Sequence, residues 1–217
     1  MPEAPQQTDS PAIDLKDPIL AALLAWLVPG LGHWYQGRRA KAVLFFVCIM
    51  GLFVYGVFLG GGYRVDDRFD PAGKERFLGY GRAVYFSWQN DDKRLYYVSQ
   101  IGVGLAAMPA LLQANWMNRH EKVGWYGRMD GFMAPPRPVQ VPPNDPNENQ
   151  PTAHDLNYLL NRSLELATIF TAVAGLLNVL AIYDAWAGPV VMQPPAKKED
   201  EEKAEAEEEE KEKEEVA

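Results

Sequence analysis

Uncharged apolar stretches alternate with polar connectors along this chain. No residue between Pro18 and Gly37 carries a full charge if His33 is neutral, and residues 42–62 and 95–117 carry none. A shorter uncharged stretch covers residues 166–183. Because a helix rises about 1.5 Å per residue, roughly 20 apolar residues are enough to cross about 30 Å of hydrocarbon. The pattern predicts an all-α integral membrane protein with four transmembrane helices, near residues 18–36, 41–62, 95–117 and 164–188.

The first two stretches predict a helical hairpin with a kink. Asp17 is placed to cap the first helix, and Pro18 stands in the first turn, where its missing N–H costs nothing. Pro29 and the glycines after it remove a backbone hydrogen bond and weaken the second half of this helix. A polar turn at residues 36–39 then leads into the second helix. We therefore expect a kinked hairpin over residues 18–62.

The elbow of this hairpin is rich in glycine, aromatic and basic residues. Its motif consists of Pro29, Gly30, Gly32, His33, Trp34, Tyr35, Gly37 and Arg38. This segment resembles the hairpin of the two-transmembrane-helix domain family, which implies two membrane-crossing helices joined by a short turn. The arginine that this family has before its aromatic residue is missing here. Lys41-Ala42 also replaces the glycine that the family has early in its second helix.

The chain as a whole, including the segment AGLLNVLAIYDAWAGP, is similar to an uncharacterised multi-pass membrane protein family of planctomycete-type bacteria. This resemblance implies the bacterial cytoplasmic membrane and no known activity. The positive-inside rule places the first turn, with Arg38, Arg39 and Lys41, in the cytoplasm. With four spans, the N- and C-termini are then both expected outside.

Changes in composition divide the chain into seven parts. Thr152 with Asp155 resembles a helix start, and Gly188-Pro189 is a helix stop. Dense prolines prevent a helix in the second connector, and the Glu- and Lys-rich C-terminus has no apolar stripe to bury, so it predicts disorder. The predicted parts are a polar tail (1–17), the hairpin (18–62), a polar aromatic connector (63–94), a third transmembrane helix (95–117), a Pro-rich connector (118–151), an amphipathic start with the fourth transmembrane helix (152–190) and a charged tail (191–217).

Small residues recur at helical spacing on two of the predicted spans. One span has two glycines four residues apart, and another has four small residues at the same interval. Such ridges let helices approach closely in a membrane. The candidate packing residues are Gly56, Gly60, Ser163, Ala167, Thr171 and Gly175.

Three polar residues stand inside otherwise apolar stretches: His33, Asn178 and Asp184. An ionisable group at membrane depth is a functional candidate by default. His33 is close in sequence to Arg38, and Asp184 is close to the end of its stretch, which favours a structural role for both at the membrane interface over a functional one. Asn178 is deeper, and we expect it to make an interhelical hydrogen bond.

The sequence predicts no catalytic, cofactor or metal site. It has no nucleophile elbow, phosphate-binding glycine loop, HExxH motif or cysteine pair, since Cys48 is the only cysteine. Asp66, Asp67 and Asp70 lack the spacing of an EF-hand. The net charge of −8 comes mostly from the C-terminal tail, and no basic patch indicates nucleic acid as a partner.

A membrane-anchored scaffold or assembly factor without enzymatic activity is the favoured function. Its expected partners are the lipid bilayer and proteins bound through helix faces, the Pro-rich connector or the charged tail. A transport or channel subunit is the first alternative, and a membrane enzyme is the second. Transport is favoured if His33, Asn178 and Asp184 meet in one cavity. Scaffolding is favoured if they are dispersed and bonded locally.

Overall fold

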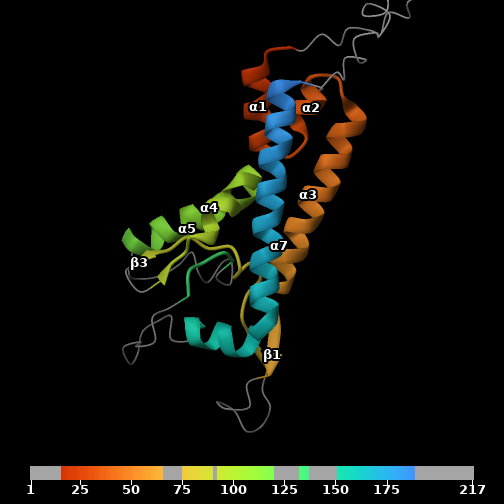
Figure 1. Cartoon of the computed structure of the whole chain (residues 1–217). Helices are drawn as coiled ribbons and strands as arrows, with labels where there is room; N and C mark the ends of the chain where they lie inside the picture. The colour runs from red at the N-terminus through yellow and green to blue at the C-terminus, as the bar shows by residue number, and fades with distance from the viewer. Residues whose placement is uncertain (1–15, 66–74, 90–91, 120–131, 137–150, 189–217) are drawn as a thin grey trace, which may run out of the picture.

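The computed structural model describes residues 16–65, 75–89, 92–119, 132–136 and 151–188 (Figure 1). These residues are mostly helical, and three of their helices are long and apolar enough to cross a membrane: Arg39–Leu59, Tyr96–Asn115 and Ala153–Ala187. The membrane class agrees with the prediction, but three candidates stand in place of four predicted spans. The charged C-terminal tail, the acidic triplet Asp66, Asp67 and Asp70, and most of the N-terminal tail and the Pro-rich connector lie outside the described residues.

The predicted first span is not one helix but two short ones. α1 (Pro18–Leu27) begins where the sequence predicts, because the Asp17 carboxylate accepts hydrogen bonds from the backbone N–H groups of Ile19 and Leu20. Its 10 residues extend about 15 Å, half of the roughly 30 Å of a hydrocarbon core. The helix ends there because Pro29 has no N–H with which to continue it.

The chain reverses direction at the elbow. Gly30 has φ +82°, which favours glycine, and α2 (Leu31–Tyr35) then runs back beside α1. Gly32 of α2 lies directly against the backbone of Ala21 in α1. The Lys16 ammonium, just before α1, lies 5.0 Å from the centroid of the Tyr35 ring at the end of α2. Both ends of this segment therefore lie at the same end of the molecule, so a reversal replaces the predicted kink.

Two long antiparallel helices form the frame of the molecule. α3 (Arg39–Leu59) runs alongside α7 (Ala153–Ala187) over most of its length (Figure 1). Gly56, near the end of α3, lies against Thr171 of α7. The start of α3 meets the last turns of α7, where Arg38 contacts Asp184. The two helices therefore pack against each other in antiparallel directions.

α7 begins and ends as the sequence predicts but is broken once. Thr152 and Asp155 form a capping box at its start, and Gly188 is its C-terminal cap. At Asn161 the backbone leaves helical geometry, with φ +39° and ψ −124°. The first turns of α7 consequently lie across the lower end of the molecule, at a steep angle to the long apolar part (Figure 1).

The third candidate span is interrupted at Gly104, whose backbone has φ +79° and ψ −130°. Its pieces are α4 (Tyr96–Gln100), the 3-10 helix η1 (Ile101–Ala107) and α5 (Met108–Arg119). Before the segment, Arg94 donates from Nη2 to the carbonyl oxygen of Ala83 at 3.1 Å. After it, the carbonyl oxygen of Ala134 accepts from Nη1 of Arg82 at 2.9 Å. The chain therefore runs along α7 as far as Gly104 and later returns to the loop that contains Arg82 and Ala83.

The connector between α3 and α4 contains two short antiparallel strand pairs, which add to the predicted all-α fold. β1 (Tyr63–Val65) pairs with β2 (Glu75–Phe77), and β3 (Trp88–Gln89) pairs with β4 (Asp92–Lys93). The loop between the pairs is buried, including Leu78, Val84 and the charged Arg82. This buried part of the predicted polar connector therefore packs against the helices and is not a solvated loop.

Candidate functional site

The carboxylate of Asp184 joins the end of α7 to the first hairpin. His33 Nε2 donates to Asp184 Oδ2 at 2.8 Å, and Arg38 Nη2 donates to the same oxygen at 2.6 Å. Lys41 Nζ lies 3.4 and 3.3 Å from the two carboxylate oxygens. The His33 side chain is fully buried, whereas that of Asp184 is 27% exposed. Two of the predicted intramembrane polar residues thus belong to one ion-pair cluster.

The same turn also satisfies the last carbonyl groups of α7. Gln36 Nε2 donates to the carbonyl oxygen of Ala185 at 2.6 Å, and Arg38 Nη1 donates to that of Asp184 at 3.3 Å. The final carbonyls of a helix have no partner within it and carry its partial negative charge. Amide and guanidinium donors at this position therefore act as a C-terminal cap supplied by another part of the chain.

Asn178 joins both interrupted segments to α7. Its Nδ2 donates to the carbonyl oxygen of Ala25 in α1 at 3.1 Å and to that of Gly102 in η1 at 2.8 Å, and its side chain is fully buried. In a continuous helix the Ala25 carbonyl would accept from residue 29, which is a proline. The break at Gly104 likewise disturbs the helical pattern around Gly102. One amide thus supplies the donor that Pro29 removes from Ala25 and bonds to the backbone beside the break at Gly104 as well.

The two breaks touch each other beside Asn178 of α7. A Cβ at Gly104 would overlap the carbonyl oxygen of Trp26, in the last turn of α1. Pro29, Gly30 and Gly104 are all buried. Non-helical backbone at membrane depth is tolerated only where protein covers it or where it lines a water-filled cavity. Here each break covers the other, and α7 covers both.

A second polar contact fixes α4 on the lower part of α7. Gln100 Nε2 donates to Thr171 Oγ1 at 2.8 Å and to the carbonyl oxygen of Ala83 at 2.9 Å. Arg94 Nη2 donates to Thr168 Oγ1 at 3.0 Å. These contacts bring the buried loop, the start of α4 and one face of α7 together. Polar side chains therefore join neighbouring elements to α7 at three levels: at Thr168 and Thr171, at Asn178, and at Asp184.

The predicted small residues lie mostly at close helix contacts. Gly175 lies against the backbone of Ser99, and Gly56 packs on Ala167 and Thr171, so that α7 is approached from two sides. A Cβ at Gly175 or Gly56 would overlap the neighbouring atoms. The remaining members are Gly60, which faces Ala83 and Ala167, and the half-buried Ser163.

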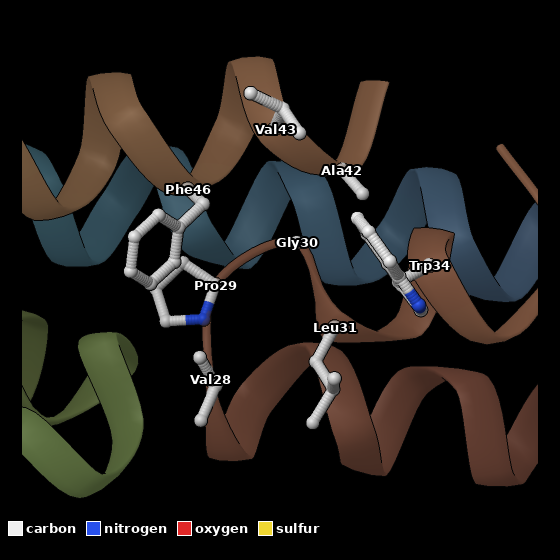
Figure 2. A pocket seen from close by; sticks show the side chains of 8 residues that line it. All are labelled: Val28, Pro29, Gly30, Leu31, Trp34, Ala42, Val43 and Phe46. Atoms are coloured by element: carbon white, nitrogen blue, oxygen red, sulfur yellow. The ribbon is translucent and has the colours of Figure 1, made fainter. Parts of the chain in front are cut away.

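The elbow and the first turns of α3 enclose an apolar pocket of about 260 Å³ (Figure 2). It is lined by Val28, Pro29, Gly30, Leu31, Trp34, Ala42, Val43 and Phe46.

The residues of the elbow motif divide into three groups by what they contact. Pro29, Gly30 and Trp34 line the pocket, Gly32, His33 and Tyr35 pack toward α1 and α7, and Gly37 and Arg38 form the turn into α3.

The sequence did not identify the partners of these polar residues. Gly102, Gly104 and Pro109 inside an apolar stretch are a local signal of an interrupted helix, so the break itself could have been predicted. The contact between His33 and Asp184 has no comparable local signal, because it depends on how distant segments pack.

The fold and its polar contacts define a helical protein of the membrane class, in which side chains of one long helix hold interrupted segments together. Within this class, the chain belongs to DUF6677, a family of unknown function, whose model matches residues 20–198 and so extends from α1 through α7. No curated protein and no solved structure matches the chain. The resemblances to the two-transmembrane-helix family and to planctomycete-type proteins stay predictions.

Proposed function

We propose that the protein is a membrane-embedded scaffold or assembly factor of the bacterial cytoplasmic membrane. The proposed role involves no chemical step and no cofactor. Its support is the way the intramembrane polar groups are used. Asn178 bonds to two backbone breaks, and Asp184 bonds to the turn before α3. His33 meets Asp184, but Asn178 bonds at a separate level of α7, and all of these contacts hold elements together, which supports a scaffold more than a shared polar cavity.

The proposed arrangement in the membrane has two crossing helices and two re-entrant segments. α3 and the long part of α7 cross the bilayer. The α1–α2 segment and the α4–η1–α5 segment enter from opposite ends and return, because each begins and ends beside the same neighbours. The N-terminus, the turn at residues 36–38 and the end of α7 then share one side. The two connectors share the other.

The proposed arrangement changes which basic residues share a side of the membrane, and so it changes the orientation that the positive-inside rule favours. The side with the termini carries Lys16, Arg38, Arg39 and Lys41, with Lys197, Lys198, Lys203, Lys211 and Lys213 after α7. The two connectors carry more basic residues, namely Arg64, Arg68, Lys74, Arg76, Arg82, Lys93, Arg94, Arg119, Lys122, Arg128 and Arg137. The positive-inside rule therefore places the connectors in the cytoplasm and both termini outside. The first turn moves outside with them, opposite to the sequence-based expectation.

A transport or channel subunit is the second candidate, and the interrupted segments favour it. Transporters form substrate and ion sites from discontinuous helices near the bilayer centre. Asn178 Oδ1 and Gln100 Oε1 are buried and have no hydrogen-bond partner among the described residues. Acceptor oxygens are thus present close to the breaks. Against this role, the pocket at the elbow has an apolar lining.

The two candidates make opposite predictions for assembly and flux. For the scaffold, the full chain cross-linked in its native membrane is expected to yield partner proteins in fixed ratio. Replacing residues 197–217 by an uncharged Gly-Ser segment of equal length is expected to lose part of that set without affecting insertion, because the tail's composition offers many charges and no apolar stripe. Proteoliposomes are expected to show no ion flux above protein-free vesicles. Flux that Asn178→Leu abolishes, together with absence of stoichiometric partners, would favour transport and contradict the scaffold.

A further inference from the structure

The pocket at the elbow opens on the surface of the candidate span α3. Figure 2 shows Phe46 and Trp34 on its two sides, with Leu31 and Val28 below and Val43 above. Trp34, Val43 and Phe46 are 53%, 51% and 46% exposed. α3 is the most hydrophobic of the three candidate spans. An occupant that enters between these side chains therefore comes from the hydrocarbon region of the bilayer.

The pocket is the right size for one hydrocarbon chain. Its volume of about 260 Å³ is just below the roughly 300–1,000 Å³ of sites that hold whole small molecules. Its lining is formed by aliphatic and aromatic side chains and by glycine. Such a surface offers dispersion contacts and burial but no fixed polar partner. It suits a single acyl chain better than a complete lipid.

Cations stand where the headgroup of that lipid would lie. The Arg39 guanidinium carbon lies 5.8 Å from the centroid of the Trp34 ring, which lines the pocket, and Arg39 is exposed. The nearby Arg38 and Lys41 share the single carboxylate of Asp184, and the Lys41 side chain is 47% exposed. The turn therefore carries an excess of positive charge beside the pocket. Lys16 and Asp17, near α1, offset each other.

The first turn of α3 adds to this attraction. Arg38, the residue before it, makes no side-chain cap, and of the first N–H groups of α3 that of Arg39 donates to the Gly37 carbonyl oxygen. Free backbone N–H groups and the positive end of the helix dipole favour an anion at this position. Arginine binds phosphate through parallel hydrogen bonds, and basic residues beside a membrane attract anionic lipids. Charge, helix end and apolar pocket thus point to the same ligand.

We propose that the elbow pocket is a binding site for an acidic phospholipid. One acyl chain fills the pocket between Trp34 and Phe46, and the headgroup phosphate binds Arg39, which lies against the Trp34 ring. The bound chain contacts the α1–α2 elbow and α3 at once, so it joins the first re-entrant segment to the first crossing helix. The site requires neither a protein partner nor a transport path, and it stands independently of the scaffold role.

Quenching of tryptophan fluorescence by brominated acyl chains tests the site directly. The full chain in mild detergent is titrated with brominated phosphatidylglycerol and, separately, with brominated phosphatidylcholine. The Trp34 signal is the difference between the native protein and Trp34→Phe, because the chain has 6 tryptophans. We expect phosphatidylglycerol to quench this signal at a clearly lower concentration than phosphatidylcholine. Arg39→Gln is expected to raise the half-quenching concentration of phosphatidylglycerol about fivefold.

Controls separate the pocket from general charge and from free phosphate. Lys93→Gln removes an exposed cation at the other end of the molecule and is expected to leave the titration unchanged. Val43→Phe narrows the pocket at an exposed position, so it is expected to reduce quenching by both lipids. Equal quenching by the two lipids, an unchanged titration in Arg39→Gln, or full competition by inorganic phosphate alone would each overturn the proposal. If Arg39→Gln does not fold, the lipid comparison and Val43→Phe decide the result.

Discussion

At the scale of single residues, the fold depends on polar side chains that replace missing backbone partners. Asn178 is the clearest example, because one buried amide bonds to Ala25 and Gly102 in segments that are far apart in the sequence. An unpaired carbonyl group is costly where no water is present. A polar residue at membrane depth therefore has a structural explanation here, whether or not it also has a functional one.

The Asn178→Leu variant is expected to destabilise the protein by about 1–3 kcal/mol. Two interhelical hydrogen bonds are lost, each typically worth about 0.6–2 kcal/mol in membrane proteins, and two carbonyls lose a donor. The free energy of unfolding is measured in mixed micelles by denaturant titration. Leu180→Ala, at a 65% exposed position on the same helix, is the control and is expected to change stability much less. Equal losses in both variants would show that Asn178 does not join the segments.

At the scale of elements, short helices meet end to end where continuous spans were expected. α1 ends at Leu27 and η1 breaks at Gly104, and these ends are in direct contact. Gly104 is required there for two separate reasons: its φ of +79° disfavours side chains, and the Trp26 carbonyl occupies the space of a Cβ. The packing of one segment thus depends on the exact path of the other.

Gly104→Ala is expected to destabilise the protein by several kcal/mol. A sparsely populated backbone conformation such as φ +79° with ψ −130° costs an L-residue about 1–3 kcal/mol, and the overlap with backbone adds an overpacking cost of about 1–3 kcal/mol. Gly51→Ala is a matched control, because Gly51 is helical and exposed, and no atom beyond its own turn of helix lies within 4 Å of the place that its Cβ would take. It is expected to be neutral or to stabilise α3 by about 0.5–1 kcal/mol. Thermal melting of both purified variants measures the contrast, and similar melting temperatures would contradict the close contact.

At the scale of the whole molecule, different elements lie at its two ends. One end holds Lys16, the turn before α3 and the end of α7. The other holds the strand pairs, the buried loop and the start of α7. Four continuous spans would place Lys16 and Arg39 on opposite sides of the membrane. The proposed pair of re-entrant segments places them together.

Single cysteines in a Cys48→Ala background distinguish these arrangements. Lys16→Cys and Arg39→Cys are expected to react with a membrane-impermeant maleimide on intact cells, because both lie on the outer side in the proposed orientation. Lys93→Cys and His154→Cys are expected to react only after permeabilisation. All four positions are exposed in the structure. Opposite labelling within either pair would contradict the re-entrant segment between its members, and inverted labelling of both pairs would reverse the orientation alone.

The membrane class, several helix ends and the weak points at Pro29 and Gly104 could be predicted from the amino-acid sequence, whereas the break at Asn161 in α7 has no glycine or proline to signal it. Charge segregation, the Asp17 cap, the Thr152–Asp155 capping box and the stop at Gly188 act within a few residues, so they are visible locally. That the weak points are reversals became clear only from the packing of the folded chain. Pro29 removes a donor in any fold, but whether the chain kinks or turns back depends on Gly32 reaching Ala21 and on Asn178 reaching the Ala25 carbonyl. The bond from Asn178 joins residues far apart in sequence, and no local preference specifies it.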